Sequence, residues 1–181
     1  MLPHDLILQE VKQVLDLCDT SSTNKFIDVI RSSRQVISYG AGRVGFSMRG
    51  FSKRLSHLGF NSYFLEDTAV PSTRKGDLLI LASGSGETAS VRAIAEIAVR
   101  NELIIVLVTA RQESSIASLS NLKFVIPAPN KTDHGSVVSS QPMTSLFEQA
   151  LMIFFDAMVL KMMSVYGIDE EFMKQRHNVL E

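Results

Sequence analysis

Two glycine-rich segments contain the residue types that bind a phosphate or a similar anion. Residues 40–45 read Gly-Ala-Gly-Arg-Val-Gly, and residues 83–88 read Ser-Gly-Ser-Gly-Glu-Thr. Each segment stands between a predicted strand and a predicted helix. Glycine allows a tight turn at such a junction, and the first turn of the helix offers N–H groups and a positive dipole end. The expected anion ligands are, in chain order, Gly42, Ser83, Gly84, Ser85, Gly86 and Thr88.

The first segment by itself leaves two interpretations open. It matches the pattern G-x-G-x-x-G in the context of a dinucleotide-binding site, which would hold a ligand such as NAD. Glu66 and Asp67 follow about 20 residues later, where a ribose-binding carboxylate would stand. Alternatively, the glycines only allow the helix to pack closely against the strand.

The second segment favours a single phosphate group. Ser83, Ser85 and Thr88 provide three hydroxyl groups within six residues, next to backbone amides and the start of a helix. This set suits the terminal phosphate of a small molecule. The alternative is that Ser85 is simply the N-cap of the following helix, a position at which serine is common.

The elements that must position these segments follow the pattern of a parallel α/β sheet. Short apolar runs alternate with longer amphipathic stretches. The predicted strands are 35–39, 62–65, 78–82, 104–109 and 124–126, and the helices between them are 44–57, 89–101 and 114–119. In a five-stranded sheet of order 2-1-3-4-5, the loops after the first and third strands flank the switch point, where ligands bind. Those loops are the two glycine-rich segments. A dinucleotide fold usually needs a sixth strand, for which the chain has little room.

Helices are also predicted on both sides of this region, at 5–17, 23–33, 144–165 and 169–177. The helix at 144–165 is apolar around more than one face, which predicts a core helix that also forms part of an oligomer interface. The polar loop 127–142 predicts a mobile active-site or subunit-contact loop. We expect one domain over residues 1–181, with N-terminal helices in 1–34, the sheet and crossover helices in 35–127, and C-terminal helices in 143–181.

Composition excludes several classes of protein. Of the 181 residues, 45% are hydrophobic and 20% charged, as in a folded globular domain. The net charge of −1 argues against a nucleic-acid partner. Cys18 is the single cysteine, which excludes an internal disulfide and a thiolate metal cluster, and the scattered histidines give no case for a metal. No apolar run reaches the roughly 18 residues of a membrane span. We expect a cytoplasmic protein that contacts neither membrane nor nucleic acid.

Five segments together resemble the SIS (sugar isomerase) domain family. They are 40–45, 54–60, 83–88, 141–149 and 176–181. The run Gln-Pro-x-x-Ser-Leu-Phe-Glu-Gln at 141–149 and the C-terminal segment are most similar to one group within it, the 6-phospho-3-hexuloisomerases. The resemblance implies a flavodoxin-like, three-layer α/β/α sandwich with a five-stranded parallel sheet. It also implies a homo-oligomer, a tetramer more often than a dimer, and no metal or organic cofactor.

The resemblance implies a small phosphorylated sugar as substrate. The expected reaction interconverts D-arabino-3-hexulose 6-phosphate and D-fructose 6-phosphate through an enediol(ate), the second step of formaldehyde fixation in the ribulose monophosphate pathway. Glu148 resembles the helix glutamate that serves as the base in such isomerases. The spacing Ser145-x-x-Glu148 also fits a capping box, in which the carboxylate would close the helix N-terminus instead.

Two histidines are the candidates for moving protons between the substrate oxygens. His177 is expected to enter the site of a neighbouring subunit. His57 stands at the end of a predicted helix, where its alternative role is to compensate the helix dipole. Gln141 belongs to the segment that carries the resemblance and is an expected substrate ligand.

Arg43 and Arg54 are the expected cations of the site. They are eleven residues apart on one predicted helix, a spacing that returns to nearly the same face. The alternative for Arg54 is a surface ion pair with Glu66 or Asp67. Val44 departs from the family pattern, which has serine at this position, so one hydroxyl donor to the phosphate is expected to be missing.

The sequence is also compatible with other functions. The chain could be another phosphosugar isomerase, or a non-catalytic sensor of the same fold that binds a sugar phosphate. The dinucleotide-binding protein that residues 40–45 permit is a third possibility. Glu148 and His177 favour catalysis over sensing.

Overall fold

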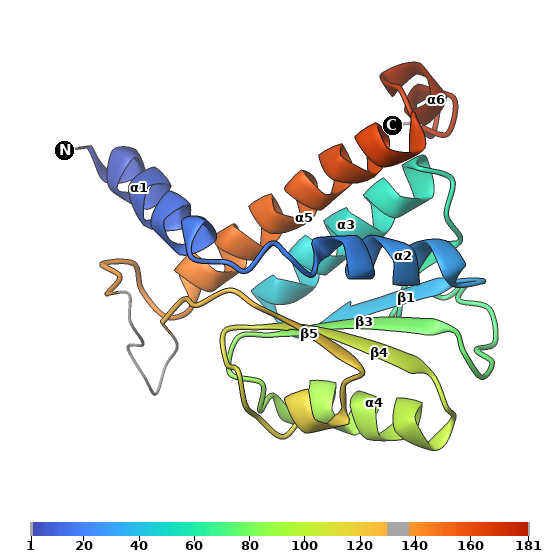
Figure 1. Cartoon of the computed structure of the whole chain (residues 1–181), viewed down its shortest axis with the longest axis horizontal. Coiled ribbons are helices and arrows are strands. Elements are labelled where there is room, and N and C mark those ends of the chain that lie inside the picture. Colours follow the sequence, from blue (N-terminus) through green and yellow to red (C-terminus); the bar gives the residue numbers. More distant parts are fainter. Residues whose placement is uncertain (1, 130–137, 181) are drawn as a thin grey trace.

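A five-stranded parallel sheet forms the middle layer of the structure (Figure 1). The structure is a computed structural model that describes residues 2–129 and 138–180. Its strands are β1 (Val36–Gly40), β2 (Ser62–Phe64), β3 (Leu78–Ser83), β4 (Ile104–Thr109) and β5 (Leu122–Val125). They are arranged in the order β2-β1-β3-β4-β5, and all four neighbouring pairs are parallel. The predicted sheet and its strand order are confirmed.

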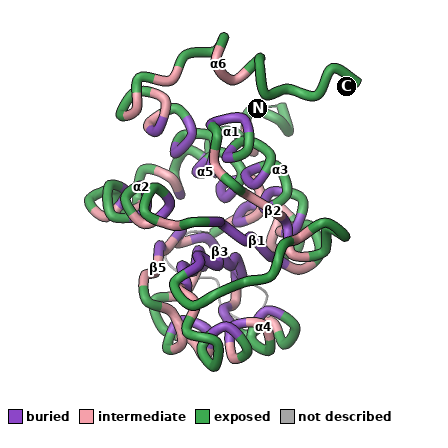
Figure 2. Tube along the Cα trace, turned by 90° about the vertical axis from the view of Figure 1, so that its right-hand side faces the viewer, coloured by how far each residue is buried: buried purple, intermediate pink, exposed green. Residues whose placement is uncertain are grey.

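The central strands are buried on both faces, which explains why their sequences are apolar throughout. All six residues of β3 are buried, and so are five of the six residues of β4. Figure 2 shows these strands as a buried layer between helices whose outer surfaces are exposed. A parallel sheet that is covered by helices requires apolar side chains on both of its faces.

Helices cover the two faces of the sheet (Figure 1). One face carries α2 (Thr23–Ser32), α3 (Arg43–His57) and α5 (Ser145–Tyr166), with α1 (Pro3–Asp16) packed against α5. The other face carries α4 (Ala89–Arg100) and the 3₁₀ turn η1 (Ala117–Leu119). The short helix α6 (Glu170–Lys174) contacts α3. This is the expected α/β/α sandwich.

The predicted helix at 114–119 is wrong, because only the 3₁₀ turn Ala117–Leu119 forms there. Ser114 Oγ accepts a hydrogen bond from the backbone N–H of Ala117 at 3.1 Å. The Ser118 hydroxyl donates to the backbone carbonyl of Ser114 at 3.0 Å. Serine side chains that bond to the nearby backbone compete with the regular hydrogen bonds of an α-helix.

The long helix α5 lies mostly in the core. Phe155 stacks on Phe51 of α3, with the ring centroids 4.1 Å apart, and Phe147 is fully buried. On the outer side of the helix, Met152 and Leu160 are 55% and 68% exposed. The predicted core role is therefore confirmed, and an oligomer interface on the exposed side stays a prediction.

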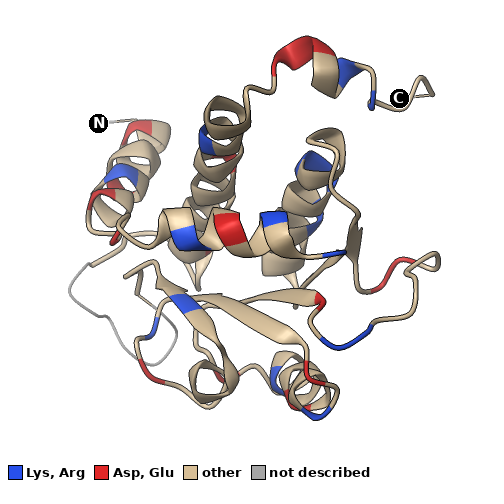
Figure 3. Cartoon of the chain, turned by 45° about the vertical axis from the view of Figure 1, so that its right-hand side comes forward, with Lys and Arg blue, Asp and Glu red and all other residues tan. Residues whose placement is uncertain are grey.

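The described surface carries charged residues of both signs, interspersed among the elements (Figure 3). Within residues 2–129 and 138–180, no helix is long and apolar enough to cross a membrane. Of the predicted loop 127–142, residues 130–137 lie outside the described residues.

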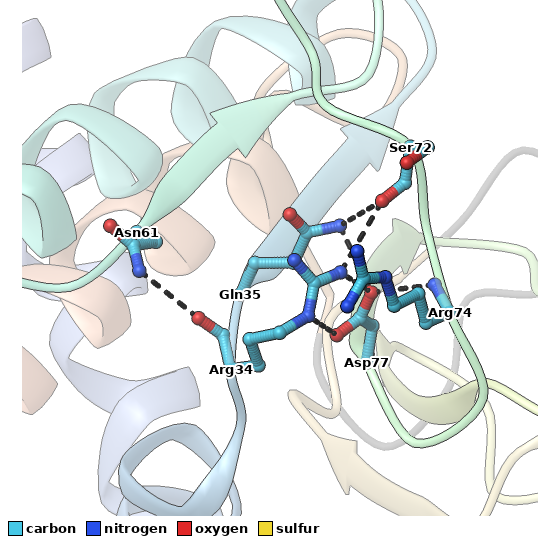
Figure 4. Close-up of polar contacts among 6 residues, drawn as sticks. All are labelled: Arg34, Gln35, Asn61, Ser72, Arg74 and Asp77. Carbon is cyan, nitrogen blue, oxygen red and sulfur yellow. Dashed lines mark hydrogen bonds and ion pairs between the residues drawn. The ribbon is translucent and has the colours of Figure 1, made fainter.

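At the amino ends of β1 and β3, a buried carboxylate ties two chain segments together (Figure 4). Asp77 is only 2% exposed and accepts hydrogen bonds from the guanidinium of Arg34, the amide of Gln35 and the backbone N–H of Arg74. Arg34 and Gln35 also donate to the carbonyl of Ser72. We call these five residues the amino-end cluster. The cluster fixes the loop that enters β3 against the start of β1.

Candidate active site

The carboxyl ends of the strands open onto a cavity of about 940 Å³, which we call the strand-end cavity. It is lined by residues 41–44, 82–85, 87–88, 111, 113, 142–145 and 148. These residues come from the loops after β1, β3 and β4 and from the start of α5. The cavity therefore lies at the predicted switch point of the sheet, and its size is within the range of small-molecule sites.

The first glycine-rich segment turns the chain sharply from β1 into α3. Gly42 is the N-cap of α3 and has φ +60°, a conformation that favours glycine. A Cβ atom on Gly45 would lie 2.6 Å from the carbonyl oxygen of Gly40, so the helix and strand approach very closely there. The packing interpretation therefore applies to Gly45, whereas Gly42 lines the cavity.

The acidic pair at 66–67, expected at the ribose of a dinucleotide, does not line the strand-end cavity. Both carboxylates instead form ion pairs with Arg49 of α3, at 2.9 Å for Glu66 and 3.0 Å for Asp67. The surface ion pair that we considered for Arg54 is thus made by Arg49. This geometry removes the carboxylate support for the dinucleotide interpretation.

The hydroxyl groups of the second glycine-rich segment bond to one another and to loop amides in the cavity wall. The Ser83 and Thr88 hydroxyl oxygens are 2.8 Å apart, and Ser83 Oγ accepts the N–H of Gly86 at 3.1 Å. Ser85 Oγ accepts the N–H of Glu87 at 3.1 Å. Thr88 is the N-cap of α4, so the interpretation of Ser85 as the N-cap is wrong. Ser83, Ser85 and Thr88 all line the cavity.

Gly86 allows this loop to pack closely against Ser114, in the segment that follows β4. It has φ +68°, and a Cβ atom there would lie 2.1 Å from Ser114 Oγ. Gly84 lines the cavity and Gly86 does not. The structure therefore gives Gly86 a packing role, and its expected contact with the ligand stays a prediction.

Glu148 is in the first turn of α5, and its side chain lines the cavity. Thr144 Oγ1 donates to one carboxylate oxygen of Glu148 at 3.0 Å. Arg43 Nε lies 2.7 Å from the other oxygen, in an ion pair that lacks the alignment of a hydrogen bond. The N-cap of α5 is Thr144, and no side chain makes a capping hydrogen bond. The capping-box interpretation is therefore wrong, because the carboxylate turns to Arg43 and Thr144 and away from the helix amides.

Gln141 does not line the strand-end cavity. Its Nε2 donates a hydrogen bond at 3.0 Å to Oε2 of Glu10, which is on α1. The structure thus places this expected substrate ligand against a helix that precedes the sheet in the chain.

Three further charged residues that the sequence motifs did not predict line the cavity: Glu87, and, after β4, Arg111 and Glu113. The available signal was their position, because residues that follow any strand of a parallel sheet gather at the same edge. The backbone N–H of Ser115 donates to Glu87 at 2.7 Å, and this hydrogen bond lowers the pKa of the Glu87 carboxyl. The cavity therefore has more charged groups than the motifs alone indicate.

Arg54, His57 and His177 lie at a second cavity of about 300 Å³, between α3 and α5, which we call the histidine cavity. The rings of the two histidines have centroids 5.3 Å apart. His57 is the last residue of α3 and is 4% exposed, so the dipole interpretation of His57 also fits its place. Lys53 and Asp156 line this cavity as well.

The two histidines lie at the far end of α3 from Arg43, although Ser47, which also lines the histidine cavity, donates a hydrogen bond to the backbone carbonyl of Glu148 at 3.3 Å. Arg43 and His57 are the first and last of the 15 residues of α3. At 1.5 Å per residue, their backbones are roughly 20 Å apart along the helix. The structure thus brings together Arg43, Glu148 and the loop 83–88, and it leaves the two histidines and Arg54 outside that group.

The strand-end cavity combines two kinds of chemistry. The loop 83–88 presents hydroxyl and amide groups that can bind a phosphate at the start of α4. On the wall formed by α5, Glu148 offers a carboxylate that can act as a general base, with the guanidinium of Arg43 beside it. This arrangement suits the removal of a proton from a phosphorylated small molecule.

Comparisons with known proteins identify the family of the chain. The model of the SIS domain family matches residues 29–153. The chain is 38% identical to the 3-hexulose-6-phosphate isomerase of Bacillus subtilis, over 97% of this chain and 95% of the relative. It is 35% identical to the 3-hexulose-6-phosphate isomerase of Mycobacterium gastri, over 97% of this chain and 88% of the relative.

A solved structure shows the same fold. The crystal structure of a Methanococcus jannaschii protein, from which a function as 3-hexulose-6-phosphate isomerase was inferred, superimposes with a TM-score of 0.83 at 30% identity and covers 98% of both chains. The name 3-hexulose-6-phosphate isomerase is a synonym of 6-phospho-3-hexuloisomerase, so these relatives are the group that the sequence resembles. The chain therefore belongs to the SIS domain family and, within it, to the family of 3-hexulose-6-phosphate isomerases.

Proposed function

We propose that this chain interconverts D-arabino-3-hexulose 6-phosphate and D-fructose 6-phosphate. The observation that carries the proposal is that the Glu148 carboxylate and the hydroxyl-rich loop 83–88 line one cavity. The family to which the chain belongs supports the same reaction. The wider proposal is that the protein works in the cytoplasm, in the second step of ribulose monophosphate formaldehyde fixation.

The loop 83–88 binds the phosphate in this proposal. Ser83, Ser85 and Thr88 contribute hydroxyl groups, and the amides at the start of α4 contribute N–H donors. Gly42 lines the same cavity, at the start of α3. Binding the phosphate at one end holds the carbon chain of the sugar across the cavity toward α5.

Glu148 is the proposed base. It removes the proton from C3 of fructose 6-phosphate, which yields an enediol(ate) between C2 and C3, and it returns a proton to C2 to give the 3-ketose. Arg43, whose Nε is 2.7 Å from the carboxylate, is placed to stabilise the negative charge that develops on the substrate oxygen. The isomerisation moves two hydrogens and leaves the oxidation level of the molecule unchanged, so its balance requires no redox cofactor.

The histidine cavity completes the site of a neighbouring subunit in this proposal. The Ser47 hydroxyl bonds to the backbone carbonyl of Glu148, and Ser47 and His57 are ten residues apart on α3, so their backbones are separated by roughly 15 Å. The His177 ring lies beside His57, and we take this separation as too long for the two histidines to act on the same substrate as their own Glu148. The histidine cavity contains Lys53 and Arg54 against one carboxylate, Asp156. The strand-end cavity contains three carboxylates, of Glu87, Glu113 and Glu148, against Arg43 and Arg111. The exposed side of α5, with Met152 and Leu160, supplies apolar surface for a homo-oligomer, for which we favour a tetramer.

A coupled assay tests the proposed activity. 3-Hexulose 6-phosphate is generated from formaldehyde and ribulose 5-phosphate by a separate synthase, and fructose 6-phosphate is measured as it forms. We expect turnover that depends on the added protein. Binding of fructose 6-phosphate without turnover would instead indicate a sensor, and a thermal shift with NAD but not with fructose 6-phosphate would contradict the proposal.

Mixing inactive variants tests the shared site. Glu148→Gln and His177→Asn proteins are each expected to be inactive, while refolding the two together should restore activity at sites that combine intact Glu148 and intact His177. Mixing either variant with itself is the control. A mixture that stays inactive, although mass spectrometry shows mixed oligomers, would contradict the neighbouring-subunit role of His177.

A further inference from the structure

A buried carboxylate on α1 holds the chain segment that leads into the strand-end cavity. Glu10 is 6% exposed. Its carboxylate accepts hydrogen bonds from Ser139 Oγ at 2.7 Å, from the backbone N–H of Ser140 at 2.9 Å and from Gln141 Nε2 at 3.0 Å. Ser139 Oγ also accepts the backbone N–H of Gln141 at 3.1 Å. Three consecutive residues are therefore gathered around one side chain that precedes them by 129 to 131 positions.

The residues that follow this segment form the wall of the cavity. Pro142, Met143 and Thr144 all line it, and α5 begins at the next residue. Met143 has φ +59°, a backbone conformation that is strained for a residue other than glycine and persists only where the surroundings enforce it. Thr144 donates the hydrogen bond that orients Glu148. A continuous stretch of chain thus connects the bonds made by Glu10 to the proposed base.

The chemistry at Glu10 suits a fixed anchor. Burial would raise the pKa of the Glu10 carboxyl, but the hydrogen bonds from Ser139, Ser140 and Gln141 outweigh this effect, so its pKa lies below the ordinary value of 4.5. A buried carboxylate is costly unless such donors surround it. The hydrogen bonds are directional, and they hold the backbone at Ser140 as well as two side chains. An apolar side chain could fill the same space but could not hold the segment in one register.

We propose that Glu10 is a positioning residue for catalysis. By holding residues 139–141 against α1, it sets the backbone at Met143 and the orientation of Thr144, and through Thr144 the carboxylate of Glu148. In this proposal, Gln141 acts as a hydrogen-bond donor to Glu10. The inference rests on the proposed function, because it assigns Glu10 a role in presenting the proposed base.

The test compares Glu10→Ala and Glu10→Gln with a matched control on the same helix. Asp16→Ala removes an exposed carboxylate that pairs with Lys12 and should leave kcat unchanged. We expect Glu10→Ala to lower kcat by about 10- to 100-fold, the cost of displacing a catalytic group by about 1 Å. Inhibition by inorganic phosphate should stay within twofold, because the hydrogen bonds to the Glu10 carboxylate come from residues 139–141 and the proposed phosphate site is the loop 83–88. A purely structural role would lower the melting temperature and leave kcat of the folded protein unaltered.

Two further measurements locate the effect. The double variant Glu10→Gln/Gln141→Glu swaps the two side chains and so restores a contact between an amide and a carboxylate. It should recover part of the kcat that is lost in Glu10→Gln. Amide hydrogen exchange at residues 139–145 should be faster in Glu10→Ala than in Asp16→Ala. Where Glu10→Ala does not fold, Ser139→Ala removes the hydroxyl that bonds both to Glu10 and to the backbone N–H of Gln141, and it should lower kcat by about threefold.

The proposal is overturned if the folded Glu10 variants keep kcat within twofold of the wild type, or if phosphate inhibition weakens in parallel with kcat. It is also overturned if hydrogen exchange at 139–145 is unchanged. This last measurement needs no turnover, so it tests the anchor even where the coupled assay rejects the proposed function. A wild-type protein that lacks turnover contradicts the function alone.

Discussion

Each end of the sheet carries a carboxylate paired with an arginine, but the two carboxylates differ in their surroundings. At the amino ends of the strands, the carboxylate of Asp77 is 2% exposed, and its hydrogen bonds come from Arg34, Gln35 and a backbone amide. At the carboxyl ends, the carboxylate of Glu148 is 12% exposed and lines a cavity, and the Arg43 that pairs with it is 66% exposed. One carboxylate is enclosed by the protein, and the other faces the space in which a ligand would lie.

This difference shows that a parallel α/β sheet can place stabilising polar contacts at one edge and a ligand site at the other. All strands point the same way, so helix N-termini and strand carboxyl ends meet at one edge and attract anions, while the other edge has no such preference. We therefore expect the amino-end cluster to contribute to the stability of the fold and not to catalysis. We expect the residues of the strand-end cavity to contribute to catalysis and only a little to stability.

Glu148→Gln should have the largest effect. Loss of a general base costs 10²- to 10⁴-fold, and we expect kcat in the coupled assay to fall about 10³-fold. Glutamine keeps the shape of the side chain and can still accept the Thr144 hydroxyl, so the melting temperature should change by less than about 2 °C. The matched control is Glu96→Gln, an exposed carboxylate on α4. If the folded variant keeps a kcat above one-tenth of the wild-type value, Glu148 is not the base and the strand-end cavity loses its proposed catalytic role.

Asp77→Ala should show the opposite pattern. It leaves the Arg74 amide without the acceptor of this cluster, and it leaves Arg34 and Gln35 with only the Ser72 carbonyl, which we expect to cost about 3 kcal/mol. For a chain of this length that corresponds to a fall in melting temperature of roughly 6–12 °C, with kcat at 25 °C within twofold of wild type. Lys75→Ala, which removes an exposed ion pair in the same loop, is the control and should cost less than about 1 kcal/mol. A melting temperature equal to that of wild type would show that the cluster is dispensable.

Ser85→Ala should affect binding more than turnover. A hydroxyl that donates to a charged phosphate is worth about 1.5–3 kcal/mol, so KM for fructose 6-phosphate should rise by roughly tenfold or more. The phosphate is held equally in substrate and transition state, and kcat should therefore change little. Ser90→Ala, an exposed serine on α4 outside the cavity lining, is the control. An unchanged KM would remove Ser85 from the phosphate site.

Val44→Ser should have the smallest effect and the opposite sign. Val44 lines the cavity at the position where the family pattern has serine. A new hydroxyl there should lower KM by a few fold, on the order of one added hydrogen bond. Val44→Ala removes the same methyl groups without adding a donor, and its KM should not improve. Equal KM values for the two variants would show that position 44 does not reach the phosphate.

The sequence predicted those parts of the molecule that depend on local pattern. Apolar runs indicated the strands, and the glycine-rich segments at 40–45 and 83–88 indicated the edge at which the cavity lies. Local pattern failed at 114–119, where serine side chains bond to the backbone and leave only a 3₁₀ turn. The N-cap alternatives that local pattern allowed for Ser85 and Ser145 are also wrong, because Thr88 and Thr144 hold those positions.

Contacts between segments that are far apart in the chain could not be predicted from the sequence. Nothing in the spacing of Glu10 and Gln141 shows that they meet across 131 positions. The same applies to Arg34 and Asp77, which are 43 positions apart and form the centre of the amino-end cluster. The separation of His57 from Glu148 follows from the length of α3, yet a list of catalytic residue types does not reveal it.

Hydrogen exchange into the substrate tests the central claim most directly, that Glu148 in the strand-end cavity removes a proton from the sugar. Fructose 6-phosphate is incubated in D₂O with each protein, and deuterium at C3 is followed by NMR. We predict exchange with the wild type and with Asp77→Ala at 25 °C, and exchange at least about 100-fold slower with Glu148→Gln. Exchange by Glu148→Gln at the wild-type rate would contradict the account.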